Sequence, residues 1–229
     1  GGGRARGPPP GRPRPPRPFF CGHRRRGAPC FAPMDTSAHD PNARPAGEES
    51  PSVTLRTART DEHPDLCRAM AAIEPWQTLG ITAEALMGAF ARDAELRRVV
   101  VAERGGAIAG VIAFRPVRAL EWITNIGGGP ALASAGATPP DGGYVNCLAV
   151  FPGHQGCGAG QLLMDHAEQE TARDSGRIYL CVSDFNAGAR KFYERRGYRE
   201  AARIRDCIKP GMDELVMVCD LAAVPDPGR

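Results

Sequence analysis

The stretch from residue 145 to residue 163 constrains the fold of this chain more than any other part of the sequence. It begins as an apolar run, breaks at Pro152-Gly153, and passes through a glycine-rich turn directly into a helical pattern. The first four amides of a helix have no partner within the helix, and the helix dipole makes that end positive. Small side chains let a bulky anion approach the backbone. The segment therefore predicts a strand, a tight turn and a helix that together hold a phosphate-bearing cofactor.

The spacing of the glycines distinguishes this turn from two other phosphate-binding loops. A P-loop requires Gly-x-x-x-x-Gly-Lys, and the frame that starts at Gly153 has Ala159 in place of the lysine. The dinucleotide fingerprint Gly-x-Gly-x-x-Gly requires a glycine where Gln161 stands. The pattern that fits is Gln-x-x-Gly-x-Gly, which runs from Gln155 to Gly160.

A second segment supports this interpretation. The apolar run at residues 178–183 is typical of a strand buried on both faces, and it is followed by Asn186, Phe192-Tyr193 and Gly197-Tyr198. The two segments, in this order and at this separation, resemble the GNAT superfamily of acetyl-CoA-dependent N-acetyltransferases. The resemblance covers roughly residues 51–222. It implies an α/β (α+β) fold with a mixed, mostly antiparallel central sheet and helices on both faces.

The resemblance also implies which residues bind acetyl-CoA. Backbone groups of Leu148, Ala149 and Val150 would pair with the pantetheine arm, and Asn186 would hydrogen-bond it. An N-cap role for Asn186 is compatible with that binding role. The diphosphate would lie against the amides of the loop residues Gln155, Gly156, Cys157, Gly158, Ala159 and Gly160.

Tyr193 is the candidate general acid for the leaving thiolate. An ordinary tyrosine pKa of about 10 keeps the phenol protonated at neutral pH, as an acid requires. The general base is left open. Many members of the superfamily have a glutamate two or four residues before Leu148, where this chain has Asn146 and Tyr144. The alternatives are a water molecule or one of the carboxylates of Asp141, Glu74, Asp184 and Glu121.

The acceptor is expected to bind near the connection between the first two helices. There Glu74 would attract an ammonium group, and Trp76 would either form a wall of the acceptor pocket or fill the core beneath the loop. Tyr144 is a third candidate for substrate binding.

We expect the chain to transfer an acetyl group from acetyl-CoA to a primary amine by direct nucleophilic attack. The amine would be a small amine, an amino acid or a peptide N-terminus, and the enzyme a monomer or homodimer. The alternative is a non-catalytic acyl-CoA-binding module that acts as a sensor or scaffold. Tyr193 favours the enzyme, and the lack of a strand glutamate favours the alternative.

Local patterns predict the remaining elements. Strands are expected at residues 53–58, 97–103, 107–114, 198–206 and 213–221, and helices at 61–73, 82–93, from the glycine loop to 173, and at 186–196. Gly105-Gly106 is a hairpin signal, and Thr82 is a predicted N-cap. Residues 121–141, rich in Gly, Ala and Pro, are expected to form a mobile insertion between the third and fourth strands.

The positive charge of the chain is concentrated in its first 33 residues. They contain eight arginines, nine prolines, seven glycines and no acid, and without these arginines the formal charge of +3 becomes −5 for residues 34–229. Such a composition buries too little apolar surface to offset chain entropy. We therefore expect residues 1–50 to be a disordered tail and linker, residues 51–222 the catalytic domain, and residues 223–229 a C-terminal tail. Met34 is the first methionine, so translation starting there is an open alternative.

Composition also limits partners and location. The acidic body argues against nucleic acid as a partner, except through residues 1–33. The eight cysteines form no Cys-x-x-Cys pair and have no nearby histidine cluster, so no metal site is expected. No apolar stretch is long enough to suggest a membrane partner, and no secretory signal is recognisable. A cytoplasmic location is expected.

Overall fold

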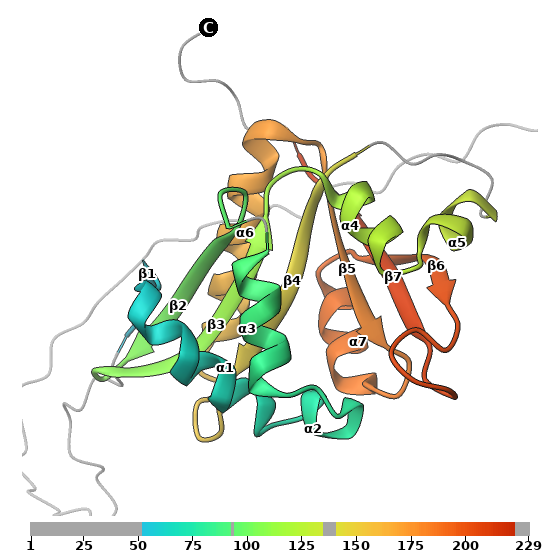
Figure 1. Cartoon of the computed structure of the whole chain (residues 1–229). Helices are drawn as coiled ribbons and strands as arrows, with labels where there is room; N and C mark the ends of the chain where they lie inside the picture. The colour runs from blue at the N-terminus through green and yellow to red at the C-terminus, as the bar shows by residue number, and fades with distance from the viewer. Residues whose placement is uncertain (1–51, 93, 135–140, 223–229) are drawn as a thin grey trace, which may run out of the picture. The chain divides into compact units, whose positions relative to one another are not determined.

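The computed structural model describes residues 52–92, 94–134 and 141–222 (Figure 1). The expected tail and linker at residues 1–50 and the C-terminal tail at 223–229 lie outside these residues.

A mixed seven-stranded sheet forms the centre of the described part. Its strands lie in the order β1-β2-β3-β4-β5-β7-β6, and all neighbours are antiparallel except β4 and β5, which are parallel. The expected mixed, mostly antiparallel sheet is confirmed. The strands are β1 (Val53–Thr57), β2 (Arg98–Arg104), β3 (Ala107–Arg115), β4 (Gly143–Val150), β5 (Arg177–Ser183), β6 (Arg199–Ile204) and β7 (Glu214–Asp220).

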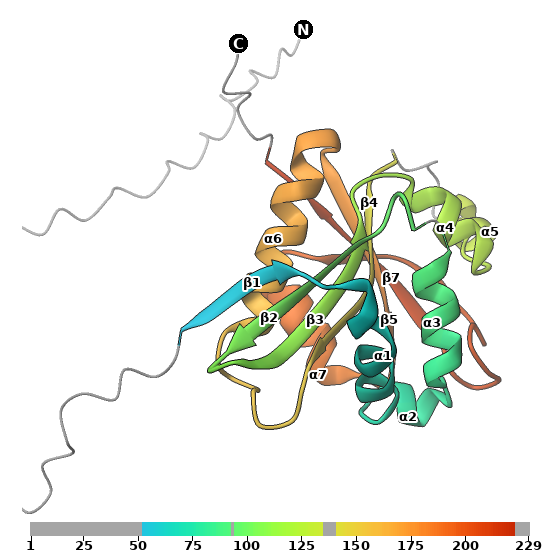
Figure 2. The ribbon, with the colours of Figure 1, turned by 60° about the vertical axis from the view of Figure 1, so that its left-hand side comes forward.

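Helices cover both faces of the sheet, as Figures 1 and 2 show from two sides. One face carries α1, α2, α3 and α4, and the other carries α6 and α7. The helices are the 3-10 turn η1 (Thr60–Glu62), α1 (His63–Ala71), α2 (Trp76–Leu79), α3 (Ala83–Ala91), α4 (Ala119–Asn125), α5 (Gly129–Ser134), α6 (Ala159–Asp174) and α7 (Ala187–Arg195).

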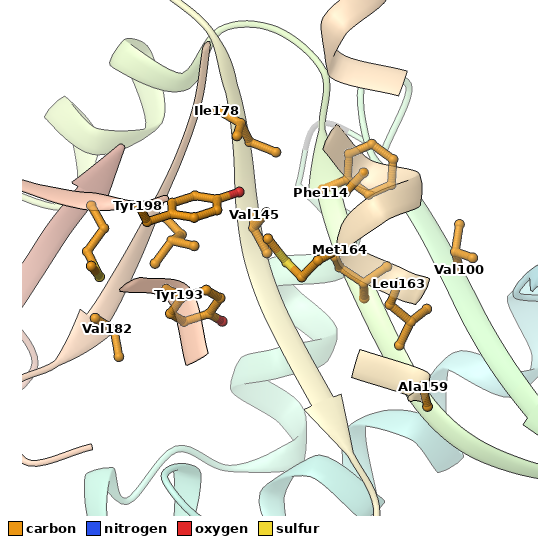
Figure 3. Packing of buried hydrophobic residues seen from close by; sticks show 14 of the residues in the cluster. Val100, Phe114, Val145, Ala159, Leu163, Met164, Ile178, Val182, Tyr193 and Tyr198 are labelled. Carbon is orange, nitrogen blue, oxygen red and sulfur yellow. The ribbon is translucent and has the colours of Figure 1, made fainter. Parts of the chain in front are cut away.

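The alternation of apolar residues along the strands produces these two layers, because successive side chains of a strand point to opposite faces. On β2, Val99 and Val101 pack with α1–α3, whereas Val100 packs with α6. Figure 3 shows Leu163 and Met164 of α6 in the same cluster as Val100. The sheet therefore separates two apolar layers, and a residue's position in a strand decides which layer it enters.

Local signals in the sequence mark several boundaries correctly. Thr82 caps α3, because its Oγ1 accepts a hydrogen bond from the Ala85 amide at 3.2 Å. Gly105 and Gly106 have φ of 60° and 79° and join β2 to β3. Left-handed backbone at both positions is what glycine permits in a tight hairpin.

The segment between β3 and β4 differs from the expected irregular insertion. Its place in the chain is confirmed, but α4 and α5 occupy residues 119–134. Ala119 and Ile123, four residues apart on α4, are fully buried. Gly128 fits closely, because a Cβ there would lie 2.8 Å from the Ile204 side chain. Packing against the sheet therefore orders this segment, despite its loop-like composition.

Candidate functional site

The parallel strands β4 and β5 separate part of the way along their length (Figure 1). Their register contains three pairs, the last being Val145 with Leu180. On the other side, β4 follows β3 to Val150, with a bulge: Ala113 pairs with Cys147 and Phe114 with Val145, so Asn146 is the extra residue. The second half of β4 therefore turns an open backbone edge toward β5. This is the edge on which the sequence placed Leu148, Ala149 and Val150 as a partner for pantetheine.

The turn after β4 has the conformation that its glycines predict. Gly153, Gly156 and Gly158 have φ of 82°, 77° and 87°. Gly158 is the N-cap of α6, and its left-handed backbone starts the helix without a side chain in the way. A Cβ on Gly160 would lie 3.2 Å from Val150 Cγ2, so the first turn of α6 packs tightly on the end of β4.

Some amides of the loop are used within it. The Gly153 amide donates to Gln155 Oε1 at 3.0 Å, and the Cys157 amide donates to the His154 carbonyl at 3.4 Å. For Gly156, Gly158 and Gly160, no acceptor is found within the described part of the chain. These open amides at the start of a 16-residue helix fit a diphosphate. The contribution of Cys157 is limited by its internal bond, and Gln155 contributes its side chain to the loop itself.

A cavity of about 630 Å³ occupies the space where β4 and β5 separate. It reaches from α7 on one face of the sheet to α2–α4 and the β6–β7 connection on the other. Most of its walls are apolar, including Trp76, Leu79, Leu86, Trp122 and Ile208. Its polar lining includes Tyr144, Asn146, Ser183, Asn186, Tyr193 and Glu214.

Asn146 presents polar atoms that the described residues leave without a partner. Both Oδ1 and Nδ2 are buried and have no hydrogen-bond partner there. Buried polar groups are ordinarily hydrogen-bonded, so an unpaired amide in a cavity fits a polar ligand. The open strand edge, the free loop amides and Asn146 together fit the pantetheine arm and the diphosphate of coenzyme A.

Tyr193 lies in the cavity wall on the α7 side of the sheet. Its side chain is 8% exposed, and burial raises the pKa of the phenol, so the hydroxyl keeps its proton. Its ring lies 5.7 Å from the Tyr198 ring, and Figure 3 shows both rings in the same cluster of buried residues. Its neighbour Phe192 packs against this cluster. Asn186 also lines the cavity, and its Oδ1 accepts from the Ala189 amide at 3.1 Å, which makes it the N-cap of α7.

Of the three residues predicted to bind the acceptor, two line the cavity and one does not. Trp76 and Tyr144 both line the cavity, and Trp76 also packs in the core under α1 and α3. Glu74 is exposed and is not part of the lining, because its carboxylate accepts a hydrogen bond from the Thr78 amide at 3.3 Å. Its proposed attraction of an ammonium group stays a prediction.

The three other carboxylates considered as a base also lie outside the cavity lining. Asp141 accepts from the amides of Gly142 and Leu120 at 2.9 and 3.1 Å. Glu121 pairs with Arg118, and Asp184 lies 3.8 Å from Arg203.

Glu214 is the carboxylate that the sequence analysis missed. It is 6% exposed, begins β7 directly opposite Ser183, and accepts a hydrogen bond from the Ser183 hydroxyl. Burial raises the pKa of Glu214, and the Ser183 hydroxyl opposes that rise. In the sequence it is only the second residue of the strand expected at 213–221, and the pairing of β5 with β7 brings it to the cavity.

The rim of the cavity is tied by one long-range hydrogen bond. Lys209 Nζ, on the β6–β7 connection, donates to the Thr78 carbonyl of α2 at 2.5 Å. Thr78 is exposed and Lys209 is half-buried, and they lie next to the lining residues Leu79 and Ile208, respectively.

Two kinds of feature are absent from the described residues. None of their helices combines the length and hydrophobicity needed to cross a membrane. The same residues contain no group of three His, Cys, Asp or Glu side chains that could hold a metal ion.

Comparison with known proteins agrees with this geometry. Residues 55–198 match the family model described as acetyltransferase (GNAT) family. A mycothiol acetyltransferase from Beutenbergia cavernae is 39% identical over 87 residues, which is 36% of this chain and only 29% of that protein.

Solved structures with a similar fold are more distant in sequence. Arabidopsis thaliana Naa50, in complex with the bisubstrate analogue CoA-Ac-MVNAL, is 20% identical with a TM-score of 0.54, covering 74% of this chain and 99% of that one. The ribosomal-protein-S18-alanine N-acetyltransferase of Escherichia coli is 16% identical with a TM-score of 0.52, covering 77% and 99%. YncA of Salmonella typhimurium, solved with acetyl-CoA, is 18% identical with a TM-score of 0.51, covering 77% and 98%. At these identities the likeness shows the fold.

Proposed function

Since the chain belongs to the acetyltransferase (GNAT) family, we propose that it is an acetyl-CoA-dependent N-acetyltransferase in which a primary amine in the cavity between β4 and β5 attacks the thioester directly. The observation that carries this proposal is the cavity itself. It connects the open edge of β4, the phenol of Tyr193 and the apolar walls of α2–α4 within one space. Both substrates can therefore meet without a covalent enzyme intermediate.

Acetyl-CoA would bind along the open edge of β4. Backbone groups of Leu148, Ala149 and Val150 would pair with the pantetheine arm as a further strand would, and Asn186 would hydrogen-bond it. The free amides from Gln155 to Gly160 would hold the diphosphate at the start of α6. A backbone amide on the same edge would polarise the thioester carbonyl.

The chemistry then needs two proton movements. The amine nitrogen attacks the carbonyl carbon, the carbon–sulfur bond breaks, and the phenol of Tyr193 gives its proton to the leaving sulfur. The nitrogen loses a proton to a base, and the phenol is restored from solvent. Burial keeps Tyr193 protonated, which suits the donor of this proton.

The class of amine is not given by the comparisons. The names of similar proteins mention mycothiol, a ribosomal-protein alanine and a peptide-bearing analogue, and each name concerns that protein. A small amine, an amino acid and a peptide N-terminus are the acceptors proposed from the sequence. A cytoplasmic location and a monomeric or homodimeric state stay predictions.

A Tyr193→Phe variant tests the proposal. Phenylalanine fills the same volume without a proton to give, so kcat should fall by about 10²-fold or more, while KM for acetyl-CoA stays within twofold. Release of free thiol across a panel of amines measures both constants.

Tyr198→Phe is the matched control, because that hydroxyl donates to Glu168 at 3.1 Å and lies outside the cavity lining. Equal kcat in Tyr193→Phe and the parent protein would contradict the role of Tyr193. If the parent protein binds acetyl-CoA but acetylates no amine, the proposal fails in favour of a non-catalytic acyl-CoA-binding module.

A further inference from the structure

A single formal charge lies in the acceptor half of the cavity. Among the described residues that line it, Glu214 is the only one with a charged side chain, and the lining contains no lysine, arginine or histidine. Glu214 is on the face of the sheet that carries α4, because it alternates with Val216 and Val218 along β7. Tyr193 belongs to the opposite layer. The two ionisable groups therefore flank the opening between β4 and β5 from its two sides.

The surroundings of Glu214 do not neutralise its charge. The groups that act on it electrostatically come from β4, β5 and the β6–β7 connection, and all are acids: Tyr144, Cys181, Asp184 and Cys207. Arg203, on the neighbouring strand β6, pairs instead with Asp184 and Asp213, at 3.8 and 3.5 Å. Ser183 offers a neutral hydroxyl. Within the described part of the chain, Glu214 makes no ion pair.

A buried carboxylate without a cation is costly to the folded protein, and a cationic ligand removes that cost. The walls around Glu214 fix what else the ligand must be. Trp76, Trp122 and Ile208 offer apolar surface, which favours an apolar body attached to the cation.

We propose that Glu214 receives the ammonium group of the acceptor and takes up its proton, so that the cavity selects primary amines carried on an apolar body. The inference rests on the proposed function and deepens it. One N–H proton passes from the ammonium to a Glu214 oxygen, which frees the nitrogen lone pair for attack on the thioester carbon. The Glu214 carboxyl later returns the proton to water.

The same charge arrangement acts against free amino acids. An α-carboxylate would enter a cavity whose lining holds a carboxylate and no cation, so it would be both desolvated and repelled. An arylalkylamine and the apolar N-terminal residue of a peptide share the required chemistry, because neither carries a carboxylate next to the amine.

Three acceptors that differ only at the α-carbon test this selectivity. Phenethylamine, phenylalanine amide and phenylalanine share one apolar body and carry a hydrogen, an amide and a carboxylate, respectively. Phenethylamine or phenylalanine amide should be acetylated with kcat/KM at least tenfold above that of phenylalanine. If phenethylamine is the better acceptor, the result favours a small amine as the substrate. If phenylalanine amide is better, it favours a peptide N-terminus. Phenylalanine acetylated as well as both would overturn the inference.

A Glu214→Gln variant tests the residue itself. The amide keeps the size of the side chain and removes its charge, so kcat/KM for the amine should fall at least tenfold, while KM for acetyl-CoA stays within twofold. Glu200→Gln is the matched control, because Glu200 is exposed on β6 and lies outside the lining. A cooperative thermal transition at or above the melting temperature of the parent protein confirms that each variant is folded.

A binding measurement separates this inference from the proposed function. Calorimetry of the CoA-bound protein should show binding of phenethylamine that is lost in Glu214→Gln, and weaker binding of the neutral analogue 2-phenylethanol. Amine turnover that is unaffected by Glu214→Gln overturns the role of Glu214 and leaves the acetyltransferase proposal standing. Amine binding that depends on Glu214 but leads to no turnover overturns the acetyltransferase proposal and leaves the binding role of Glu214 standing. Absence of phenethylamine binding to the parent protein overturns the role of Glu214.

Discussion

A charge on Glu214 is costly to the folded state. Burial favours the neutral carboxyl, and the Ser183 hydroxyl offsets part of that penalty. Its neighbours Tyr144 and Cys181 are themselves buried acids that burial keeps protonated. The carboxyl is therefore the group in this half of the cavity whose charge responds to pH near its ordinary range.

This arrangement predicts how stability depends on pH. A pKa raised by folding means that the folded protein binds the Glu214 proton more tightly than the unfolded chain. The resulting stabilisation is present below the unfolded pKa of about 4.5 and is lost as pH rises through the raised folded value. Glu214→Gln should therefore gain in unfolding free energy over the parent protein between pH 5 and pH 8, as measured by urea denaturation. Ser183→Ala should show the reverse trend, because it removes the hydroxyl that lowers this pKa; parallel pH profiles for all three proteins would contradict the prediction.

Sequence motifs identified some residues of the site and could not identify others. Tyr193 and Asn186 were found because each stands at a fixed distance from its neighbours in the chain, and both line the cavity. Glu214 reaches Ser183, 31 residues away, only through the register of β5 with β7. Glu74 was chosen for its charge and its place between the first two helices, and it accepts a local hydrogen bond from Thr78 and lies outside the lining.

At the scale of the elements, the lack of a side chain has opposite consequences at two glycines. Gly110 of β3 lies against β4, where a Cβ would come 2.6 Å from the Ala149 carbonyl oxygen. Gly88 lies within α3, and a Cβ there would meet no atom within 4 Å. The first glycine allows close approach of the two strands, and the second only weakens a helix.

The two corresponding alanine variants should therefore change stability in opposite directions. Gly110→Ala must push β3 from β4 and should lower the free energy of unfolding by about 1–3 kcal/mol. Gly88→Ala should raise it by about 0.5–1 kcal/mol, because alanine is the better helix former. Urea denaturation of both variants and the parent protein measures the difference. A Gly110→Ala protein as stable as the parent would show that β3 can move away from β4 at little cost.

Elements with regular apolar patterns were predicted well, and elements formed by packing were not. Strands such as β2 and β5 contain continuous apolar runs, at residues 99–102 and 178–182, which sequence alone reveals. By contrast, α4 and α5 have seven and six residues. Helices so short are marginal on their own and depend on tertiary contacts. The contact of Gly128 with Ile204 is such a determinant, and it joins residues far apart in the chain.

At the scale of the whole molecule, the central sheet is incomplete without its co-substrate. The parallel register of β4 with β5 ends after Val145 and Leu180, and the rest of β4 has a partner on one side only. A ligand that pairs with the open edge binds the folded protein and not the unfolded chain, so it must raise stability.

Coenzyme A should therefore raise the melting temperature of the protein. At 100 times its dissociation constant, a ligand of the folded state adds about 2.7 kcal/mol, and each kcal/mol raises the melting temperature of a protein this size by about 2–4 °C. Adenosine 3′-phosphate 5′-diphosphate keeps the diphosphate but lacks the pantetheine arm, and it should produce a smaller shift at the same concentration. Thermal denaturation monitored by fluorescence measures both shifts. Equal shifts would mean that the edge of β4 contributes no binding.

The hydrogen bond from Lys209 to Thr78 has a consequence for the dimensions of the acceptor. It joins α2 to the β6–β7 connection beside the cavity, and a single hydrogen bond of this kind contributes only about 0.5–1.5 kcal/mol to stability. Under the proposed function, we therefore expect that an acceptor longer than the cavity can bind by breaking this hydrogen bond. The cavity would then select the amine-bearing end of the acceptor, and the rest would extend into solvent.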